Sequence, residues 1–209
     1  MADSTSTTTQ DARRLFRSGA CDVDHLGMVA SATPLDGVLC DRIVGACRAL
    51  PIAPPTTVGD DRYPRHRACT VQMVPANGDG ASGASWIYDL LWAYAVAAND
   101  AYFHLDITGF AREAHYCEYT PGDGHFHWHD DYSHERSTAP RKLTAIVQLS
   151  ENGDYEGGDL EVFGIEVTAA PRDRGTVIVL PSFVYHRVTA VTAGRRRALV
   201  SWISGPRLM

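Results

Sequence analysis

The chain of 209 residues is long enough for one domain with a buried core and short for two ordinary domains. Hydrophobic residues make up 44% and charged residues 21%, as in ordinary globular proteins, which excludes a fibrous or wholly disordered chain. The 19 basic and 25 acidic side chains give a net charge of −6, which argues against nucleic acid or an anionic membrane surface as a partner.

The beginning of the chain and the cysteines bear on compartment and boundaries. No signal-peptide pattern and no run of eighteen apolar residues occurs, and the five cysteines include no CxxC pair. These features predict a cytoplasmic protein with reduced thiols and no membrane segment. We expect residues 1–18, which contain a Ser/Thr cluster, to be a disordered tail and residues 19–209 to form a single domain.

Two amphipathic helices are predicted in the first half. The first begins near Thr33, a possible N-cap, with Pro34 at the first helical position, and its apolar face continues to Leu50. The second covers residues 85–99. A strand is expected between them at residues 68–74, followed by a turn-rich loop at 77–83.

From about Phe103 onward the hydrophobic period changes to two, which predicts a series of short strands. A helical start followed by many short strands predicts a mainly β (α+β) fold, closed or double-sheeted, with the helices packed on the outside. The expected strands are residues 103–107, 114–119, 126–131, 143–149, 160–163, 176–180, 187–191 and 198–203.

The histidines are concentrated ahead of an acidic pair, and this is the strongest functional signal. Residues two apart on a strand point to the same side, about 6.6 Å apart, so His129 and Asp131 can bind one metal ion. His186, which follows an apolar strand and the Pro181 turn, can supply a third ligand. Two histidines and one carboxylate leave open positions, as in non-haem Fe(II) oxygenases, whereas a structural zinc site usually uses four ligands with cysteines.

The other histidines of this strand leave an alternative open. His127 could join His129 and His186 in a three-histidine site. Otherwise we expect His125 and His127 to line the pocket or to support the metal ligands from behind, with Phe126 and Trp128 on the opposite side in packing contacts.

Three consecutive arginines precede the last strand. Alternation places Arg196 on one face and Arg195 with Arg197 on the other, so only one set can point inward. An inward arginine could bind the far carboxylate of a dicarboxylic co-substrate that chelates the metal with its other end.

Several segments together resemble the Fe(II)/2-oxoglutarate-dependent dioxygenases of the prolyl 4-hydroxylase type, including bacterial single-domain relatives. The resemblance extends from Pro34 to Pro206 and is carried by WIYDLLWAYAVAAND, YCEYTPGDGHFHWHDD, RKLTAIVQLSENGDYEGGDLEVF and GTVIVLPSFVYHRVTAVTAGRRRALVSWISGP. It implies a double-stranded β-helix, or jelly roll, with N-terminal helices packed on its outside.

The resemblance also implies a role for each matching residue. His129, Asp131 and His186 correspond to the iron ligands, Arg196 to the residue that binds the distal carboxylate of 2-oxoglutarate, and Tyr119 to a residue of the co-substrate pocket. Lys142 and Thr144 lie on a strand that faces this pocket in relatives.

The implied activity is hydroxylation of a C–H bond, because halogenating relatives replace the carboxylate that Asp131 provides. The cofactor and co-substrates are Fe(II), 2-oxoglutarate and O2, with ascorbate as a candidate reductant, and succinate and CO2 are released. The substrate class is a prolyl or amino-acid, peptide or natural-product molecule, and the loops at 77–83 and 133–140 are expected to be lids.

Two other readings remain open. One is a non-catalytic cupin-like protein that binds a metal or a small acid. The other is a zinc hydrolase, because His127, His129 and Asp131 match the HxHxD part of metallo-β-lactamase-like proteins, although Tyr132 stands where the next histidine belongs.

Overall fold

The protein is built on two antiparallel sheets and a β-ribbon. The computed structural model describes residues 16–18, 27–53, 67–76, 84–122, 124–132 and 140–207. The larger sheet has the strand order β1 (Phe16–Ser18), β2 (Val29–Ser31), β12 (Val177–Pro181), β8 (Arg141–Gln148), β15 (Arg196–Ser204), β6 (Ala114–Tyr119) and β4 (Thr70–Val74), with β5 (Gly109–Phe110) added beside β15. The smaller sheet has the order β11 (Val167–Ala169), β10 (Leu160–Phe163), β13 (His186–Val188), β7 (His125–His129) and β3 (Arg67–Ala68), while β9 (Tyr155–Gly157) pairs with β14 (Val191–Gly194).

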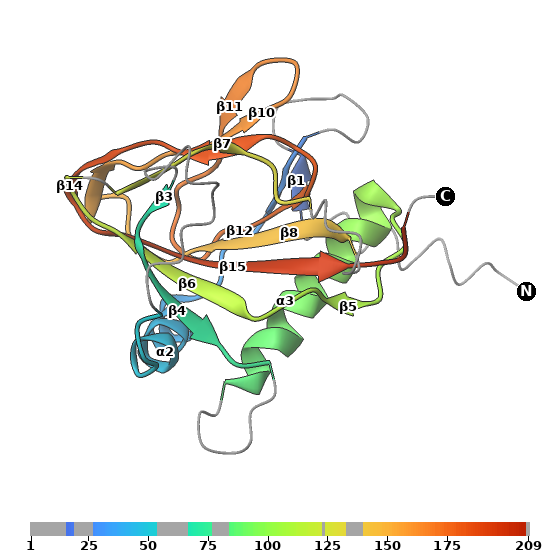
Figure 1. Ribbon diagram of the computed structural model, residues 1–209, viewed down its shortest axis with the longest axis horizontal. Coiled ribbons are helices and arrows are strands. Elements are labelled where there is room, and N and C mark those ends of the chain that lie inside the picture. The colour runs from blue at the N-terminus through green and yellow to red at the C-terminus, as the bar shows by residue number, and fades with distance from the viewer. Residues whose placement is uncertain are drawn as a thin grey trace, which may run out of the picture.

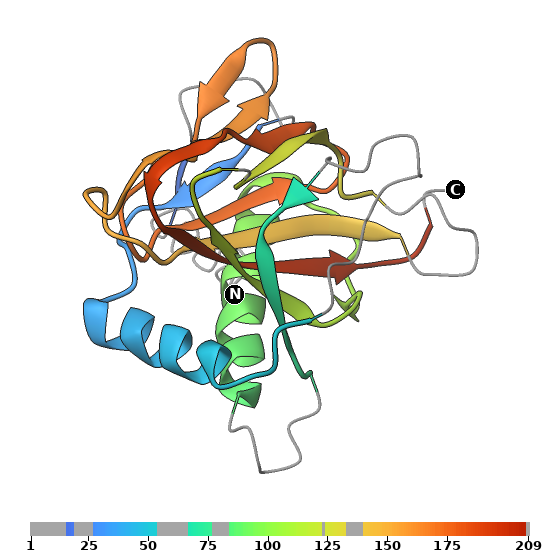
Figure 2. The same cartoon turned by 60° about the vertical axis from the view of Figure 1, so that its left-hand side comes forward.

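The two sheets form the jelly roll that the resemblance implies, and the helices lie outside it. Figure 1 shows the larger sheet across the middle with β7 and the β10–β11 hairpin above it, and Figure 2 shows helices α2 and α3 on the opposite side of the larger sheet. The prediction of a mainly β fold with external N-terminal helices is therefore confirmed.

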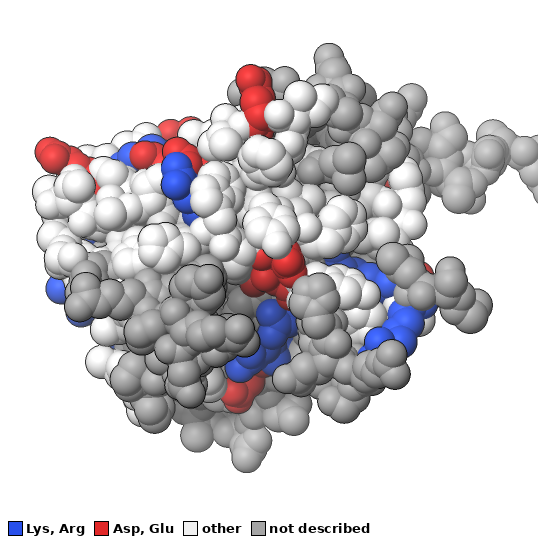
Figure 3. All heavy atoms as spheres, turned by 45° about the horizontal axis from the view of Figure 1, so that its top comes forward, with Lys and Arg blue, Asp and Glu red and all other residues white. Residues whose placement is uncertain are grey.

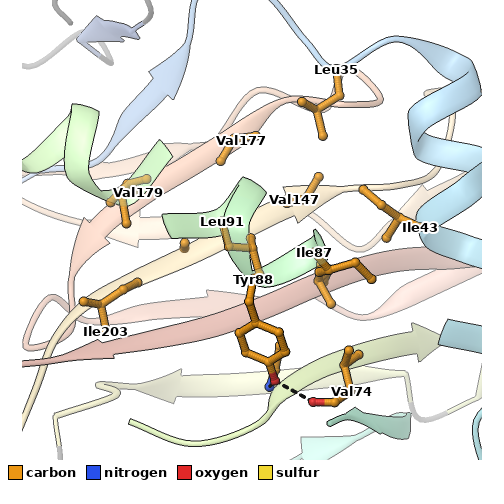
Figure 4. Close-up of a cluster of buried hydrophobic side chains, with 14 of the residues drawn as sticks. Leu35, Ile43, Val74, Ile87, Tyr88, Leu91, Val147, Val177, Val179 and Ile203 are labelled. Atoms are coloured by element: carbon orange, nitrogen blue, oxygen red, sulfur yellow. Dashed lines mark hydrogen bonds between the residues drawn. The ribbon is translucent and has the colours of Figure 1, made fainter. Parts of the chain in front are cut away.

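Side-chain alternation along the larger sheet separates two apolar cores. On β15, Leu199 and Ile203 pack against the helices, whereas Ala198 points into the space between the sheets. On β12, Val177 and Val179 belong to the helix side (Figure 4), and Ile178 and Leu180 to the inner side. This alternation decides which polar residues of these strands face the interior of the jelly roll.

The helices are α2 (Gly37–Arg48), α3 (Ser85–Ala98) and a short π-helical segment, η1 (Asn99–Phe103). The predicted start of the first helix was wrong: its N-cap is Asp36, whose Oδ1 accepts a hydrogen bond of 2.7 Å from the amide of Leu39. The α3 residue Tyr88 fixes this helix to the sheet (Figure 4), because its hydroxyl donates to the carbonyl of Val74 and accepts from the amide of Ala114.

The strand predicted at residues 103–107 was also wrong. Phe103 ends η1, and His104 has a left-handed φ of 52°. The side chain of Asn99 bonds both the amide and the carbonyl of Leu105, each at 2.9 Å, and so satisfies backbone groups that a strand would pair with a neighbour.

Two other predicted strands are interrupted where the chain passes from one sheet to the other. The strand expected at 68–74 is divided at Cys69 into β3, in the smaller sheet, and β4, in the larger sheet. The strand expected at 187–191 is divided in the same way into β13 and the start of β14. The remaining predicted strands, at 114–119, 126–131, 143–149, 160–163, 176–180 and 198–203, all occur with ends shifted by two residues or fewer.

Short strands near the N-terminus were missed, because three residues are too few to show a period. Phe16–Ser18, at the end of the expected tail, form β1 and pair with β2, so the tail ends before Phe16; residues 1–15 lie outside the described residues. Within the described part of the chain, no helix has the length and apolar character that crossing a bilayer needs.

Candidate metal and co-substrate site

Three side chains converge between the sheets as a candidate metal site. His129, at the end of β7, is directly opposite His186 of β13, and Asp131 follows β7 by two residues. The potential ligand atoms of these residues lie within 4.8 Å of one another. One carboxylate oxygen of Asp131 lies 3.8 Å from Nε2 of His129 and the other 3.4 Å from Nε2 of His186. These distances place two imidazole nitrogens and one carboxylate around a common point.

Backbone carbonyls orient both rings toward that point. Nδ1 of His129 lies 2.7 Å from the carbonyl oxygen of its neighbour His127, and Nδ1 of His186 lies 3.0 Å from that of Val184. A carbonyl can only accept, so each Nδ1 carries a proton, and Nε2 of each ring is the nitrogen directed toward Asp131 and the common point. This is the tautomer that metal-binding histidines adopt.

Hydrogen bonds also fix the position of Asp131. Its Oδ2 accepts a hydrogen bond of 2.9 Å from the hydroxyl of Thr144, which is 3.1 Å from the hydroxyl of Ser182. The amide of Asp131 donates to the carbonyl of Ser182 at 2.8 Å. Thr144, suggested by the resemblance, therefore contacts the site directly, whereas Lys142 is not among the residues that line the pocket.

The charges of the site suit a divalent cation. Burial by itself would raise the pKa of Asp131, but the neighbouring His186 and His129 outweigh this effect and hold that pKa well below its usual range. The pKa of His186 is raised, because the attraction of Asp131 exceeds the opposing effect of burial. A buried anion with two nitrogen donors fits Fe(II) and leaves further coordination positions open.

A bulge in β7 reverses the expected orientation of its other residues. The register passes from His129 opposite His186 to Phe126 opposite Val188, so two residues of β7 face one residue of β13. Phe126 consequently lines the pocket, and its ring stacks on that of His129 with centroids 3.5 Å apart.

The residues displaced by this bulge point elsewhere. His125 and His127 do not line the pocket, and His127 is exposed, so they do not form its walls. The carbonyl of His127 nevertheless supports the ring of His129 from behind, which is the other role expected for these residues. The three-histidine alternative and the HxHxD set both need His127, and neither forms. Trp128 is indeed outside the pocket, where Arg187 lies over its ring.

The converging residues open into a pocket of about 420 Å³, a volume that includes solvent at its mouth. Its walls are mainly apolar, with two arginines and the candidate metal ligands as the charged groups. The lining residues are Arg67, Cys117, Tyr119, Phe126, His129, Asp131, Ile146, Leu160, His186, Val188, Arg196, Ala198, Val200 and Trp202.

Arg196 is the inward member of the arginine run. Its side chain is 1% exposed, and its Nη2 donates a hydrogen bond of 2.9 Å to Oε1 of Gln148, while its Nε has no hydrogen-bond partner among the described residues. Arg195 and Arg197 both lie on the other face, where they form ion pairs with Glu118. A buried guanidinium with an unused donor matches the far carboxylate of a dicarboxylic co-substrate.

Two neighbours of Arg196 complete this end of the pocket. Tyr119 is buried, with its ring centroid 5.3 Å from the guanidinium carbon of Arg196, as its expected role requires. Gln148 was missed in the sequence, although it lies on the same face of β8 as Thr144. Gln148 follows Thr144 by four residues, and the alternation of side chains along a strand could have placed both on the same face.

A second polar cluster that the sequence did not indicate borders the pocket. Cys69, at the passage between the sheets, comes close to Cys117 of β6, and Arg67 donates to both sulfurs. A hydrogen bond from Cys117 and the charge of Arg67 lower the pKa of Cys69 to about 6, against the effect of burial. The loops expected to be lids, at 77–83 and 133–140, lie outside the described residues apart from Pro140.

Comparisons with known proteins agree with this geometry. Residues 114–204 match the family model of the 2OG-Fe(II) oxygenase superfamily. The chain is 38% identical over 68 residues to a PKHD-type hydroxylase of Prochlorococcus marinus, covering 32% of this chain and 31% of that protein. It is 37% identical over 89 residues to a PKHD-type hydroxylase of Parvibaculum lavamentivorans, covering 41% and 38%. The chain thus spans about a third of the length of these relatives.

Solved structures extend the likeness to almost the whole chain. A prolyl-4-hydroxylase of Pseudomonas putida matches with a TM-score of 0.67 and 20% identity, over 98% of this chain and 100% of that one. A prolyl hydroxylase of Trichoplax adhaerens, in complex with a peptide fragment of the hypoxia inducible factor oxygen degradation domain, matches with a TM-score of 0.71 and 13% identity, over 96% and 91%. At these identities the likeness is one of fold.

The fold is that of the jelly-roll oxygenase structures, and residues 114–204 match the 2OG-Fe(II) oxygenase superfamily. The similarity to PKHD-type hydroxylases and to prolyl-4-hydroxylase structures supports the resemblance found in the sequence. The cofactor and co-substrates that this family implies are Fe(II), 2-oxoglutarate and O2.

Proposed function

We propose that the protein is an Fe(II)- and 2-oxoglutarate-dependent hydroxylase, with one catalytic domain over residues 19–209. His129, Asp131 and His186 bind Fe(II), and Arg196 binds the distal carboxylate of 2-oxoglutarate. Tyr119 forms part of the wall around the co-substrate. The products are a hydroxylated small molecule or peptide, succinate and CO2.

One observation favours this function over a binding protein or a hydrolase. The same pocket contains an oriented set of two Nε2 atoms and one carboxylate, and a buried guanidinium whose Nε has no partner among the described residues. A metal site alone would suit a binding protein or a hydrolase as well. The added guanidinium matches a metal chelator that carries a second, distant carboxylate, as 2-oxoglutarate does.

The residues of the chain bind and orient the co-substrate, and they exclude water from the pocket. When bound, Fe(II) would supply the position at which 2-oxoglutarate and O2 react, so that a C–H bond of the substrate is hydroxylated. Arg196, held by Gln148, fixes the far end of 2-oxoglutarate and thereby the direction of its chelating end. The apolar side chains of Ile146, Leu160 and Val188 keep water away from the reacting atoms.

An anaerobic titration tests this function before any substrate is known. Addition of Fe(II) and then 2-oxoglutarate is expected to produce the weak visible charge-transfer band of a chelated iron 2-oxo acid. His129→Ala should abolish the band, and Arg196→Ala should raise the 2-oxoglutarate concentration needed to form it. His127→Ala is the matched control, because this exposed histidine lies on the same strand, outside the pocket, and should leave the band unchanged.

Two results would contradict the proposed function. One is iron binding without the band in the unmodified protein. The other is retention of the full band in His129→Ala. Substrate-independent formation of succinate from 2-oxoglutarate under air provides a second, chemical measure of the same activity.

A further inference from the structure

Arg67 lies next to the candidate metal site, and the proposed reaction does not use it. Its strand, β3, is the edge of the smaller sheet and places Arg67 opposite Phe126 of β7. The guanidinium carbon is 5.2 Å from the centroid of the Phe126 ring, and this ring stacks on that of His129. Arg67 therefore lines the pocket one aromatic ring away from a candidate metal ligand.

Among the described residues, no carboxylate pairs with the positive charge of Arg67. Its Nε donates to Sγ of Cys69 at 3.1 Å and its Nη2 to Sγ of Cys117 at 2.9 Å. No carboxylate of the described residues lies within ion-pair distance of Arg67, and no described residue accepts a hydrogen bond from Nη1. By contrast, Arg172 pairs with Asp159 and Arg187 with Glu161, both outside the pocket.

The contacts with the two sulfur atoms position the guanidinium but use only part of its capacity to donate hydrogen bonds. Sulfur is a weaker hydrogen-bond acceptor than a carboxylate oxygen, even when the thiol is ionised. Cys69, with its pKa lowered to about 6, partly compensates the charge of Arg67. The Nη1 donors remain available for an oxygen anion.

Other cations strengthen the positive field at this side of the pocket. The buried ring of His115 lies edge-on to Trp202, a residue of the pocket wall. Burial first, and then the charges of Arg67, Arg112 and Arg141, lower the pKa of His115 to about 3. Figure 3 shows basic side chains beside acidic ones near the middle of one face of the molecule, and further basic side chains at the rim of a hollow next to them.

The pocket thus has two inward guanidinium groups, and the co-substrate accounts for one of them. We propose that Arg67 binds a carboxylate of the primary substrate, which is therefore an organic acid. This inference rests on the proposed function, in which Arg196 is occupied by 2-oxoglutarate.

The test uses acids and their neutral amides as paired probes. The protein is loaded anaerobically with Fe(II) and 2-oxoglutarate, and its binding of the twenty free amino acids and of their carboxamides is measured by calorimetry. At least one acid is expected to bind about tenfold or more tightly than its amide, because only the acid offers an anion to Arg67. This comparison needs no variant and so does not depend on how a mutant folds.

Three variants assign the discrimination to Arg67. Arg67→Gln should weaken binding of the preferred acid by about 10- to 100-fold and leave binding of its amide unchanged. Arg67→Lys should restore part of the loss, because it keeps the charge but not the planar pair of donors. Arg187→Gln is the matched control, since Arg187 pairs with Glu161 and lies over Trp128 outside the pocket, and should behave as the unmodified protein.

The 2-oxoglutarate band separates failure of this inference from failure of the proposed function. If the unmodified protein forms no band, the proposed function falls, and this inference falls with it. If the band forms but no acid binds, or acids and amides bind equally, only the role of Arg67 is refuted. If Arg67→Gln weakens the binding of 2-oxoglutarate and leaves the binding of the acid unchanged, Arg67 binds the co-substrate, and the inference is again wrong.

Discussion

The hydroxyl of Thr144 offers a sharp test of how the pocket holds its metal. Thr144 is fully buried on β8 and donates a hydrogen bond of 2.9 Å to the Asp131 oxygen that also lies nearest to His186. Thr144→Val keeps the shape of the side chain and removes only this donor. Asp131 then loses one of the contacts that fix its carboxylate between the two histidines.

The expected size of the effect follows from the charge of the acceptor. A hydrogen bond to an ionised group contributes about 1.5–3 kcal/mol, and this carboxylate is buried and anionic. Loss of a residue that orients a metal ligand typically weakens metal binding by about 10- to 100-fold. We therefore expect Thr144→Val to reduce Fe(II) affinity by that factor, and to lower the free energy of unfolding by about 1–3 kcal/mol.

Competition with a chelator of known affinity measures the first effect, and urea denaturation measures the second. Thr144→Ser is the matched control, because it retains the hydroxyl and should recover most of the metal affinity. A merely structural role would lower stability in both variants and leave the Fe(II) affinity of the folded protein unchanged. Equal Fe(II) affinity in Thr144→Val and the unmodified protein would refute the reasoning.

Three further predictions concern the rest of the pocket and the fold. Gln148→Leu removes the acceptor that holds Arg196, so half-saturation with 2-oxoglutarate should need about five- to tenfold more co-substrate while Fe(II) affinity stays the same. Cys69 should react with iodoacetamide as a thiolate above its pKa of about 6, so its alkylation rate should reach half its maximum near pH 6. Tyr88→Phe should lower the free energy of unfolding by about 2–3 kcal/mol in a urea titration, because it leaves buried backbone groups, including the carbonyl of Val74, without a partner.

Each of these predictions has its own counter-result. Lower iron affinity in Gln148→Leu would mean that the variant disturbs the whole pocket. Cys47, whose pKa burial raises to about 12, is the unreactive reference for alkylation, and equal rates for the two thiols would contradict the charge assigned to Cys69. A change of less than about 0.5 kcal/mol in Tyr88→Phe would show that water replaces the lost hydroxyl.

Errors in the sequence-based model occurred where tertiary pairing overrides local periodicity. Strict alternation placed His127 in the pocket and Phe126 outside it. A bulge that adds one residue to β7 opposite β13 reverses both orientations. Such a bulge depends on the partner strand, so nothing in the sequence of β7 alone reveals it.

Long-range proximity explains why the Arg67 cluster was missed. Arg67 and Cys117 are fifty residues apart and meet only because the chain changes sheets at Cys69. No local spacing links them, and nothing in the sequence distinguishes Arg67 from an ordinary surface arginine.

The sequence by itself determined the class of fold, the order of most strands and the residues proposed to carry the chemistry. Local spacing was sufficient to pair His129 with Asp131, because two residues of one strand share a face wherever that strand lies. Alternation separated Arg196 from its two neighbours, and the family resemblance selected it. Only the tertiary structure decided which side of each strand became the interior, how His186 meets His129, and that a second guanidinium shares the pocket. These features depend on sheet register and on passages between sheets, which are set by the packing of distant segments and not by the residues next to them in the chain.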